Sequence, residues 1–215
     1  MSLIYDGPPA GPDVWTVILA HGAGAPMDTP FMQFMAEGLA AGGVRVVRFE
    51  FPYMAQRRVD GKKRPPNGFS KLVKHFESVI DEVVGDGPRD RLVLAGKSMG
   101  SRVAQHIADI GWDCAGVMAL GFPFHAPGKP PGDRIVGLQR GSGPPIFICQ
   151  GTRDPFGKPE EIAGYGLAER VKIAWITDGD HSLVPRKSSG RTGAQNWRET
   201  VEQMLGFIKG LPPGE

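Results

Sequence analysis

A serine, an aspartate and a histidine each follow the end of an apolar run in this sequence. Ser98 lies in Gly-Lys-Ser-Met-Gly (residues 96–100), Asp154 follows a run that ends at residue 150, and His181 follows one that ends at residue 177. A serine hydroxyl is a poor nucleophile at neutral pH and needs a base to take its proton and a carboxylate to orient that base. The chain order therefore predicts acyl chemistry with Ser98 as nucleophile, His181 as base and Asp154 as orienting acid.

The pentapeptide around Ser98 matches the nucleophile-elbow pattern G-x-S-x-G. Because 31 of the 215 residues are glycine, a chance match is easy, and the flanking elements have to decide. Residues 92–95 form a short apolar run typical of a buried parallel strand, and a helical pattern follows to residue 109. In that setting the amide of Met99 stands unpaired at a helix N-terminus, where it can bind an oxyanion.

A nucleotide-binding loop is the second interpretation of the same residues. Gly96, Lys97 and Ser98 match the end of the pattern G-x-x-x-x-G-K-S. That pattern requires a glycine at position 91, which is Arg91. The spacing argues against a phosphate-binding loop.

Other residues compete for the roles of acid and base. Asp178 and Asp180 are close to His181 in the sequence and could also orient its imidazole, but the strand-end position favours Asp154. The remaining histidines have no motif around them. We expect His21 to shape its loop, and the others to be structural or solvated: His75, His106 and His125.

Strands and helices that alternate along the chain must position these groups. Strands are expected at residues 14–20, 44–51, 92–95, 115–120, 146–150 and 171–177, and helices from Pro30, over 69–84, after the elbow, from Pro159 and around 197–208. The alternation predicts an α/β fold with a mostly parallel sheet of about six strands covered on both faces. Ligands bind such sheets beyond the carboxyl ends of the strands, so Ser98, Asp154 and His181 should meet there with the glycine-rich loop 21–24.

Two connections have no helical pattern. Residues 53–68 are expected to form a long loop with five basic residues and one aspartate at positions 57–64, a local net charge of +4. Arg57 and Arg58 are candidates for binding an anionic substrate, although such charge runs are often only solvated. The connection 121–145 is too short for a large cap domain, so we expect an open site.

The whole chain gives broader limits. Its 215 residues, 40% of them hydrophobic, suit a single domain spanning 1–215, and a net charge of +2 does not favour nucleic acid. Cys114 and Cys149 lie in apolar runs, which predicts buried free thiols and a cytoplasmic location. No run is long enough to span a membrane, and no residues have metal-ligand spacing. We therefore expect no cofactor, a small-molecule acyl substrate as partner, no membrane association, and either a monomer or a dimer.

Four segments together carry a family resemblance: HGAGAPM (21–27), GKSMGSR (96–102), GTRDPFG (151–157) and GDHS (179–182). They resemble the α/β-hydrolase superfamily and, within it, the KANL/Tex branch, which is dienelactone-hydrolase-like in general appearance. The resemblance implies a three-layer fold with six to seven strands, no large cap domain and a serine hydrolase that cleaves esters or thioesters. It also implies an oxyanion hole formed by the amides of Met99 and of the 21–24 loop, from Ala23 or Gly24.

Two other functions remain open on the sequence. An interaction module could keep this fold and dock a partner through the basic segment 57–64, although it would not need Ser98, Asp154 and His181 together. A peptidase would use the same groups on amide substrates. Turnover of short esters and of peptide amides would separate these possibilities.

Overall fold

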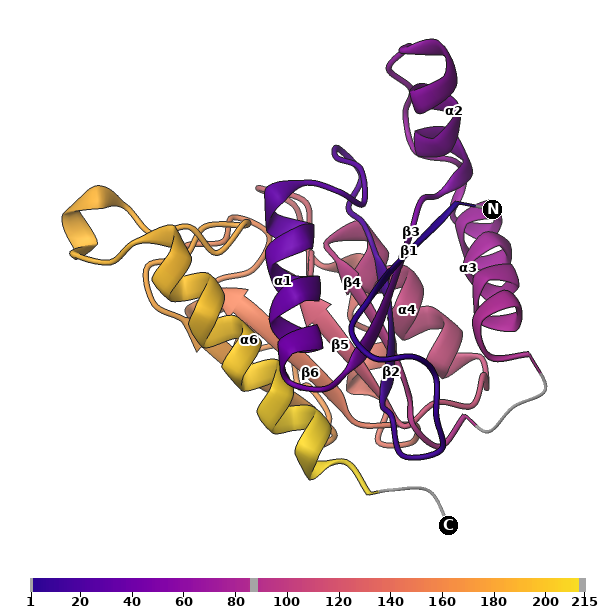
Figure 1. Ribbon diagram of the computed structural model, residues 1–215. Helices are drawn as coiled ribbons and strands as arrows, with labels where there is room; N and C mark the ends of the chain where they lie inside the picture. Colours follow the sequence, from indigo (N-terminus) through magenta and orange to yellow (C-terminus); the bar gives the residue numbers. More distant parts are fainter. Residues whose placement is uncertain (1, 86–88, 213–215) are drawn as a thin grey trace.

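The computed structural model describes residues 2–85 and 89–212, which form a seven-stranded sheet with helices on both faces (Figure 1). The strands are β1 (Leu3–Asp6), β2 (Thr16–Ala20), β3 (Arg45–Phe49), β4 (Leu92–Lys97), β5 (Gly116–Leu120), β6 (Ile146–Gly151) and β7 (Val171–Ile176). Their order in the sheet is β1-β3-β2-β4-β5-β6-β7. The pair β1–β3 is antiparallel and the other five pairs are parallel.

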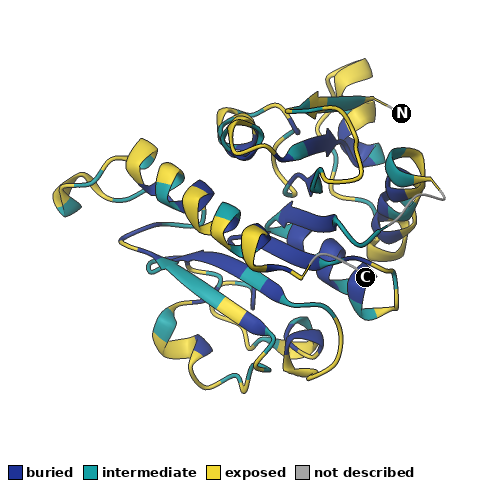
Figure 2. Cartoon of the chain, turned by 60° about the horizontal axis from the view of Figure 1, so that its bottom comes forward, coloured by how far each residue is buried: buried dark blue, intermediate teal, exposed yellow. Residues whose placement is uncertain are grey.

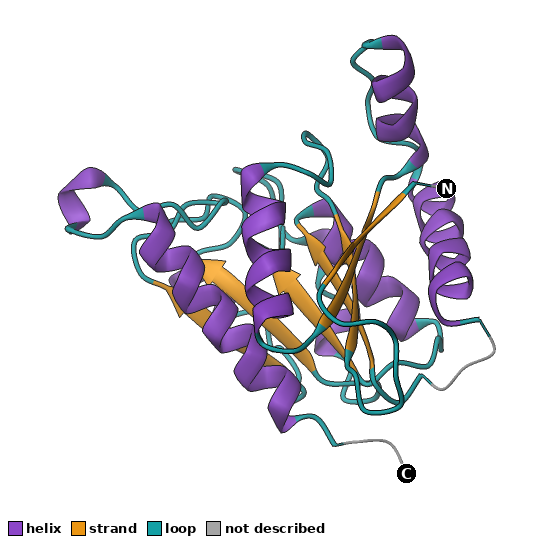
Figure 3. Cartoon of the chain, viewed as in Figure 1, coloured by secondary structure: helices purple, strands orange, loops and turns teal. Residues whose placement is uncertain are grey.

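Helices cover the two faces of this sheet. The helices of the described residues are α1 (Pro30–Ala41), α2 (Pro52–Asp60), α3 (Phe69–Val84), α4 (Met99–Asp109), α5 (Pro159–Ile162) and α6 (Gly193–Gly210), with short 3₁₀ turns η1 (Gly132–Arg134), η2 (Gly137–Gln139) and η3 (Lys187–Ser189). Helices α1 and α6 lie side by side on one face, and α3 and α4 on the other (Figure 3). Only η1 and η2 lie within residues 121–145, so the predicted fold class, without a large cap domain, is confirmed.

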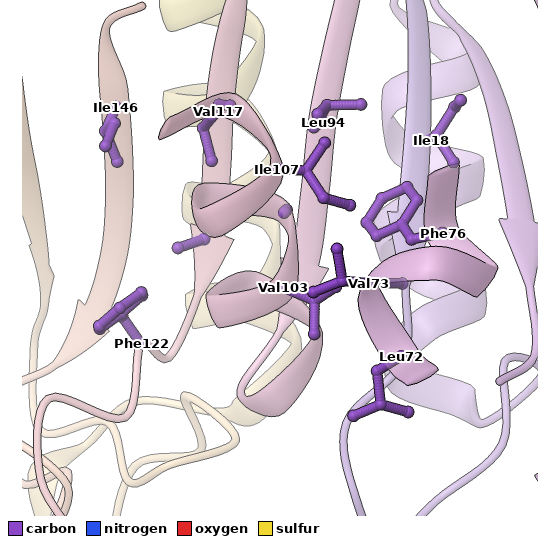
Figure 4. Packing of buried hydrophobic residues seen from close by; sticks show 14 of the residues in the cluster. Ile18, Leu72, Val73, Phe76, Leu94, Val103, Ile107, Val117, Phe122 and Ile146 are labelled. Atoms are coloured by element: carbon purple, nitrogen blue, oxygen red, sulfur yellow. The ribbon is translucent and has the colours of Figure 1, made fainter. Parts of the chain in front are cut away.

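The strands supply a core to each face because successive side chains point to opposite sides of a sheet. Ile18 and Leu94 pack with Phe76 of α3 and Ile107 of α4 (Figure 4). The alternate strand residues pack against α1 and α6, among them Val17, Leu19 and Val93. In Figure 2 the central strands are accordingly mostly dark blue, the edge strands β1 and β7 are largely teal, and the outer sides of the helices are yellow.

Two buried thiols belong to these cores. Cys114 and Cys149 are free, as predicted. Burial raises the pKa of the Cys114 thiol to about 12, so the thiolate, which is the reactive form, is scarce at neutral pH. Both cysteines act as small apolar residues.

Two helices begin and end where their sequences predict. The Thr29 side chain accepts a hydrogen bond from the Met32 amide at 3.3 Å and caps α1, with Pro30 in the first turn. Helix α3 spans the predicted residues 69–84 and ends at Gly85, whose φ is 57°. The apolar repeat of α3 faces the core, which explains why its boundaries could be predicted.

Strand β1 was not predicted. It has four residues, too few for a recognisable apolar run, and pairs with β3 in the register Ile4 opposite Arg48. The Arg48 guanidinium donates to both carboxylate oxygens of Asp6, at 2.9 and 3.0 Å. An ion pair at the edge of the sheet therefore holds this strand in place. Such a contact produces no hydrophobic pattern in the sequence from which the strand could be predicted.

The prediction of a long loop over 53–68 is wrong, because Pro52–Asp60 forms helix α2. Only the first turn of α2 is buried, through Tyr53 and Met54, and Gly61 ends the helix with a φ of 69°. The helix and the return segment project away from the body of the molecule (Figure 1). We call residues 52–67 the α2 arm. One buried turn cannot produce the repeating apolar pattern from which a helix is predicted.

The sheet order creates a crevice at its centre. From β2 the chain moves to β3 on one side, and it later enters β4 on the other side of β2. The loops that leave β2 and β4 therefore run in opposite directions, and ligands of open α/β sheets bind at such a switch point. The loop after β2 contains residues 21–24, and the turn after β4 contains Ser98.

Candidate active site

Ser98 stands on a sharp turn between β4 and α4. Its φ of 51° and ψ of −114° lie outside the regions that L-residues usually occupy. A Cβ on Gly96 would lie 2.2 Å from the carbonyl carbon of Gly100, and one on Gly100 would lie 2.6 Å from the His21 carbonyl oxygen. Both glycines of G-x-S-x-G are thus required for backbone segments to pass closely, and the turn raises Ser98 above the strand ends.

Ser98, His181 and Asp154 form a continuous hydrogen-bonded chain. Ser98 Oγ lies 2.8 Å from His181 Nε2, and His181 Nδ1 lies 2.8 Å from Asp154 Oδ2. The Asp154 side chain is completely buried, and its carboxylate accepts the hydrogen bond from the imidazole, which therefore carries its proton on Nδ1. Nε2 then carries no proton, so it can accept the proton of the Ser98 hydroxyl and act as the base.

The Asp154 carboxylate is held by two further donors. Gln150 Nε2 donates to Oδ2 at 2.9 Å, and the Phe156 amide donates to Oδ1 at 2.9 Å. Gln150 is itself completely buried, and its Nε2 also lies 3.3 Å from the Phe122 carbonyl oxygen and 3.2 Å from that of Gly157, so its two hydrogens are shared among three acceptors. These contacts fix the orientation of the carboxylate, and Gln150 was not singled out from the sequence. A polar residue at the end of the apolar run IFICQG, four residues before Asp154, was the available signal.

The rival aspartates make other contacts. Asp178 is paired with Arg186 and Arg153, and its pKa is lowered by the hydrogen bond from Arg186. Asp180 Oδ1 accepts the amide hydrogens of residues 182 and 184, at 2.8 and 3.0 Å. Both carboxylates shape the loop that carries His181, whereas Asp154 bonds to the imidazole itself.

Tyr53 fixes the orientation of the peptide groups in the loop after β2. The Tyr53 hydroxyl lies 3.2 Å from the Gly22 carbonyl oxygen and 2.9 Å from that of Ala23, and donates to them. The N–H of a trans peptide points opposite to its carbonyl, so the amides of Ala23 and Gly24 point away from Tyr53. Both residues line the same cleft as Ser98, and Met99 begins α4 beside it.

His21 holds this loop in place through hydrogen bonds that involve both ring nitrogens. It is completely buried, its Nε2 accepts the Phe51 amide hydrogen at 3.1 Å, and its Nδ1 donates to the Gly22 carbonyl at 2.6 Å. Burial lowers the pKa of His21, so the ring is neutral at pH 7. The other three histidines lie elsewhere: His75 on the Glu50 carbonyl, His106 against Phe69, and His125 beside Glu161.

The two arginines proposed to bind substrate are not brought to Ser98. Arg57 and Arg58 lie on α2, and neither lines the cleft. The Arg58 guanidinium is taken up by Glu50 at 2.6 Å and Asp28 at 2.7 Å. Its charge is therefore neutralised by the protein, which does not favour the substrate-binding role.

A cleft of about 610 Å³ opens beside Ser98 and His181. Aromatic side chains from three elements form much of its wall: Phe31, Phe156 and Trp197. Lys97, the second residue of the elbow pattern, also lines it. Neither the aromatic wall nor the roles of Tyr53 and Lys97 were predicted. Lys97 was visible within the motif, whereas the wall residues are brought together only by the fold.

The described residues contain neither a metal-ligand cluster nor a membrane-spanning helix. Within residues 2–85 and 89–212, no group of three or more His, Cys, Asp or Glu side chains is arranged to hold a metal ion. No helix in the same ranges has the length and apolar character needed to cross a membrane.

Comparison with known proteins identifies similar chains. A family model described as an alpha/beta hydrolase domain matches residues 13–209. An alpha-beta serine hydrolase homologue from Coxiella burnetii superimposes with a TM-score of 0.69 at 17% identity, over 94% of this chain and 89% of that one. A serine hydrolase without lid from Xanthomonas campestris gives 0.66 at 19% identity, over 99% and 90%. A monoacylglycerol lipase from Paleococcus ferrophilus gives 0.67 at 17% identity, over 95% and 98%. At these identities the structural matches establish the fold.

Proposed function

Since the chain belongs to the alpha/beta hydrolase domain family, we propose that it is a serine hydrolase that cleaves an ester, a thioester or a similar acyl substrate. The observation that carries this proposal is the chain of hydrogen bonds from Ser98 through His181 to Asp154, with both distances at 2.8 Å. Matches described as serine hydrolases and as a monoacylglycerol lipase support an ester as the substrate.

The first half of the reaction acylates Ser98. His181 Nε2 takes the hydroxyl proton while Oγ attacks the substrate carbonyl, which forms a tetrahedral intermediate. The amides of Met99 and Ala23, with Gly24 as the neighbouring donor, bind the developing oxyanion. The bond to the leaving group then breaks, and that group departs with the proton from His181.

The second half releases the acid. His181 takes a proton from a water molecule, whose oxygen attacks the acyl carbon, and returns that proton to Ser98 as the acyl bond breaks. Asp154 keeps its negative charge and stabilises the imidazolium that forms in both halves. Because the connection 121–145 forms no large cap, water and substrate reach Ser98 directly from the open cleft.

Finer assignments belong to the same proposal. We place the chain with the KANL/Tex branch on the four segments that resemble it. A cytoplasmic location is supported by two cysteines that are buried and free rather than disulfide-bonded. Short esters rather than peptides are the proposed substrates, since the fold carries no large gating domain beside the cleft.

The test is labelling by a fluorophosphonate together with hydrolysis of a short 4-nitrophenyl ester. The native chain should label and turn over, and Ser98→Ala should do neither, with kcat lower by at least about 10³-fold. Ser188→Ala, at an exposed serine of η3, is the matched control and should behave as the native chain. A folded native chain that neither labels nor hydrolyses the ester would reject the proposal.

A second function is favoured by one observation, the projection of the α2 arm from the body (Figure 1). Val59 on this arm is 81% exposed, and Arg57, Lys62 and Lys63 lie within four residues of it in the sequence. A partner could dock there whether or not Ser98 reacts. Deletion of residues 55–65, with a Gly-Gly bridge, would abolish such docking while ester hydrolysis shows that the body still folds.

A further inference from the structure

The cleft beside Ser98 combines an apolar wall with one amino group. Its lining includes Pro30, Phe31, Met32, Phe156 and Trp197, which suit a hydrocarbon part of a ligand. Among the described residues that line it, only His181 and Lys97 carry a titratable side chain. Since His181 is engaged with Ser98, Lys97 is the group available to a charged part of a substrate.

Lys97 is held at the cleft by its place in the elbow. It is the last residue of β4 and immediately precedes Ser98. Its Nζ donates to the His181 carbonyl oxygen at 2.5 Å and lies 5.8 Å from the ring centroid of Phe31, another lining residue. An ammonium group has three N–H donors, and this contact uses one of them.

The charge of Lys97 is not neutralised by the protein. In the described part of the chain, no carboxylate is near enough to Nζ to form an ion pair. The acidic groups whose charges act on Lys97 are Asp154 and Asp180, and both have hydrogen-bond donors of their own on their carboxylates. Burial lowers the pKa of Lys97 to about 8, although both carboxylates act against this shift. A partly buried ammonium without a counter-charge is unfavourable unless an anion joins it.

We propose that Lys97 forms an anion subsite of the hydrolase, so that the preferred substrates are esters that also carry a carboxylate. The apolar wall would hold the hydrocarbon part, and the two free N–H donors of Lys97 would bind the carboxylate while Ser98 attacks the ester carbonyl. This inference depends on the proposed hydrolase function. It replaces Arg57 and Arg58, whose positions do not favour such a role, with a residue inside the cleft.

The carboxylate could lie on the acyl part or on the alcohol part of the ester. The acyl pair is 4-nitrophenyl hydrogen adipate and 4-nitrophenyl hexanoate, which have the same acyl chain length and differ in the terminal charge. The alcohol pair is 7-acetoxycoumarin-3-carboxylate and 7-acetoxycoumarin, which share the acetyl group. The pair in which the native chain prefers the anionic member identifies the side that faces Lys97.

The experiment compares native, Lys97→Met and Lys97→Arg chains on both pairs. Lys97→Met should lower kcat/KM for the preferred anionic ester by about tenfold to hundredfold through KM, because a charge-assisted hydrogen bond is lost. Because the contact with the His181 carbonyl oxygen is lost as well, kcat/KM for the neutral ester should also fall, but by a smaller factor, so that the ratio of anionic over neutral ester drops. Lys97→Arg keeps the charge and should retain the preference for the anionic ester.

Other outcomes would overturn the subsite. An equal loss on neutral and anionic esters would mean that Lys97 acts only by supporting the His181 carbonyl. No loss on either ester would mean that it has no role in binding. If no ester is hydrolysed and Ser98→Ala has the same activity as the native chain, the hydrolase function itself fails. This result is distinct from the two outcomes that overturn only the subsite.

A pH series on the native chain tests the subsite without any substitution. The ratio of kcat/KM for anionic over neutral ester cancels any pH dependence that the two esters have in common. Because Lys97 is charged below its pKa of about 8, the ratio should be high at pH 7 and fall as pH rises through 8. A ratio that stays constant from pH 7 to 9 would contradict the proposal even if Lys97→Met does not fold.

Discussion

The elbow and the α2 arm are both strand-to-helix units, but they differ in how much of the helix is buried. In each, a strand that ends at the same edge of the sheet leads into a helix, β4 into α4 and β3 into α2. Seven residues of α4 are buried, whereas α2 buries only Tyr53 and Met54. The elbow is therefore fixed by close packing of its helix against the sheet, and the arm is attached through its base alone. This contrast indicates that substitutions should have large effects at the elbow and small ones along the arm.

The sharpest test compares one glycine from each unit. Gly100→Ala should lower the free energy of unfolding by about 3 kcal/mol or more, because its Cβ would lie 2.6 Å from a backbone oxygen. The gain of about 1 kcal/mol in helix propensity from glycine to alanine is smaller than this clash. Gly61 ends α2 with a φ of 69°, and a Cβ there would lie in open space. Gly61→Ala should therefore lower the free energy of unfolding by only about 1 kcal/mol. Urea unfolding measures both, and equal losses would remove the distinction between the two units.

A second comparison uses two glutamines. Gln150→Leu removes the buried donor to Asp154 Oδ2 and should lower kcat by about 10²-fold with little change in KM, since the carboxylate and the imidazole lose their fixed orientation. Gln56→Leu removes a similar bond to Asp60 on the exposed arm and should leave kcat unchanged. Ester kinetics on folded variants decide the matter. A rise in KM with constant kcat for Gln150→Leu would show that Gln150 affects binding and not the orientation of Asp154.

The smallest expected effect is a dependence of stability on pH at the base of the arm. Burial holds the pKa of His21 below its usual 6.5, so the folded protein keeps this ring neutral while the unfolded chain takes up a proton near pH 6.5. Stability from His21 is present above pH 6.5 and is lost as pH falls below it, by at most about 1.4 kcal/mol per pH unit. Urea midpoints of the native chain and of His21→Gln between pH 7.5 and 5 should converge as the pH falls. Parallel curves would mean that His21 does not titrate in this range.

The sequence predicts what repeated patterns encode and misses what single contacts hold. Helix α3 was predicted to the residue because its apolar repeat covers the core, and the elbow was found because its glycines and its strand are adjacent in sequence. The α2 arm left no such pattern, since its first turn alone is buried. Gln150 and the wall of the cleft escaped prediction for another reason: their partners are distant in the chain, and only the fold brings them together.

The wall of the cleft and the groups proposed to react come from different structural elements. Ser98, Asp154 and His181 follow strand ends, whereas Phe31 and Trp197 come from α1 and α6 and pack edge to face with ring centroids 5.3 Å apart. Replacing this aromatic pair reshapes the space for substrate without moving a strand. Laboratory evolution can therefore alter substrate preference through two helix positions, while the geometry of the three hydrogen-bonded residues is inherited unchanged.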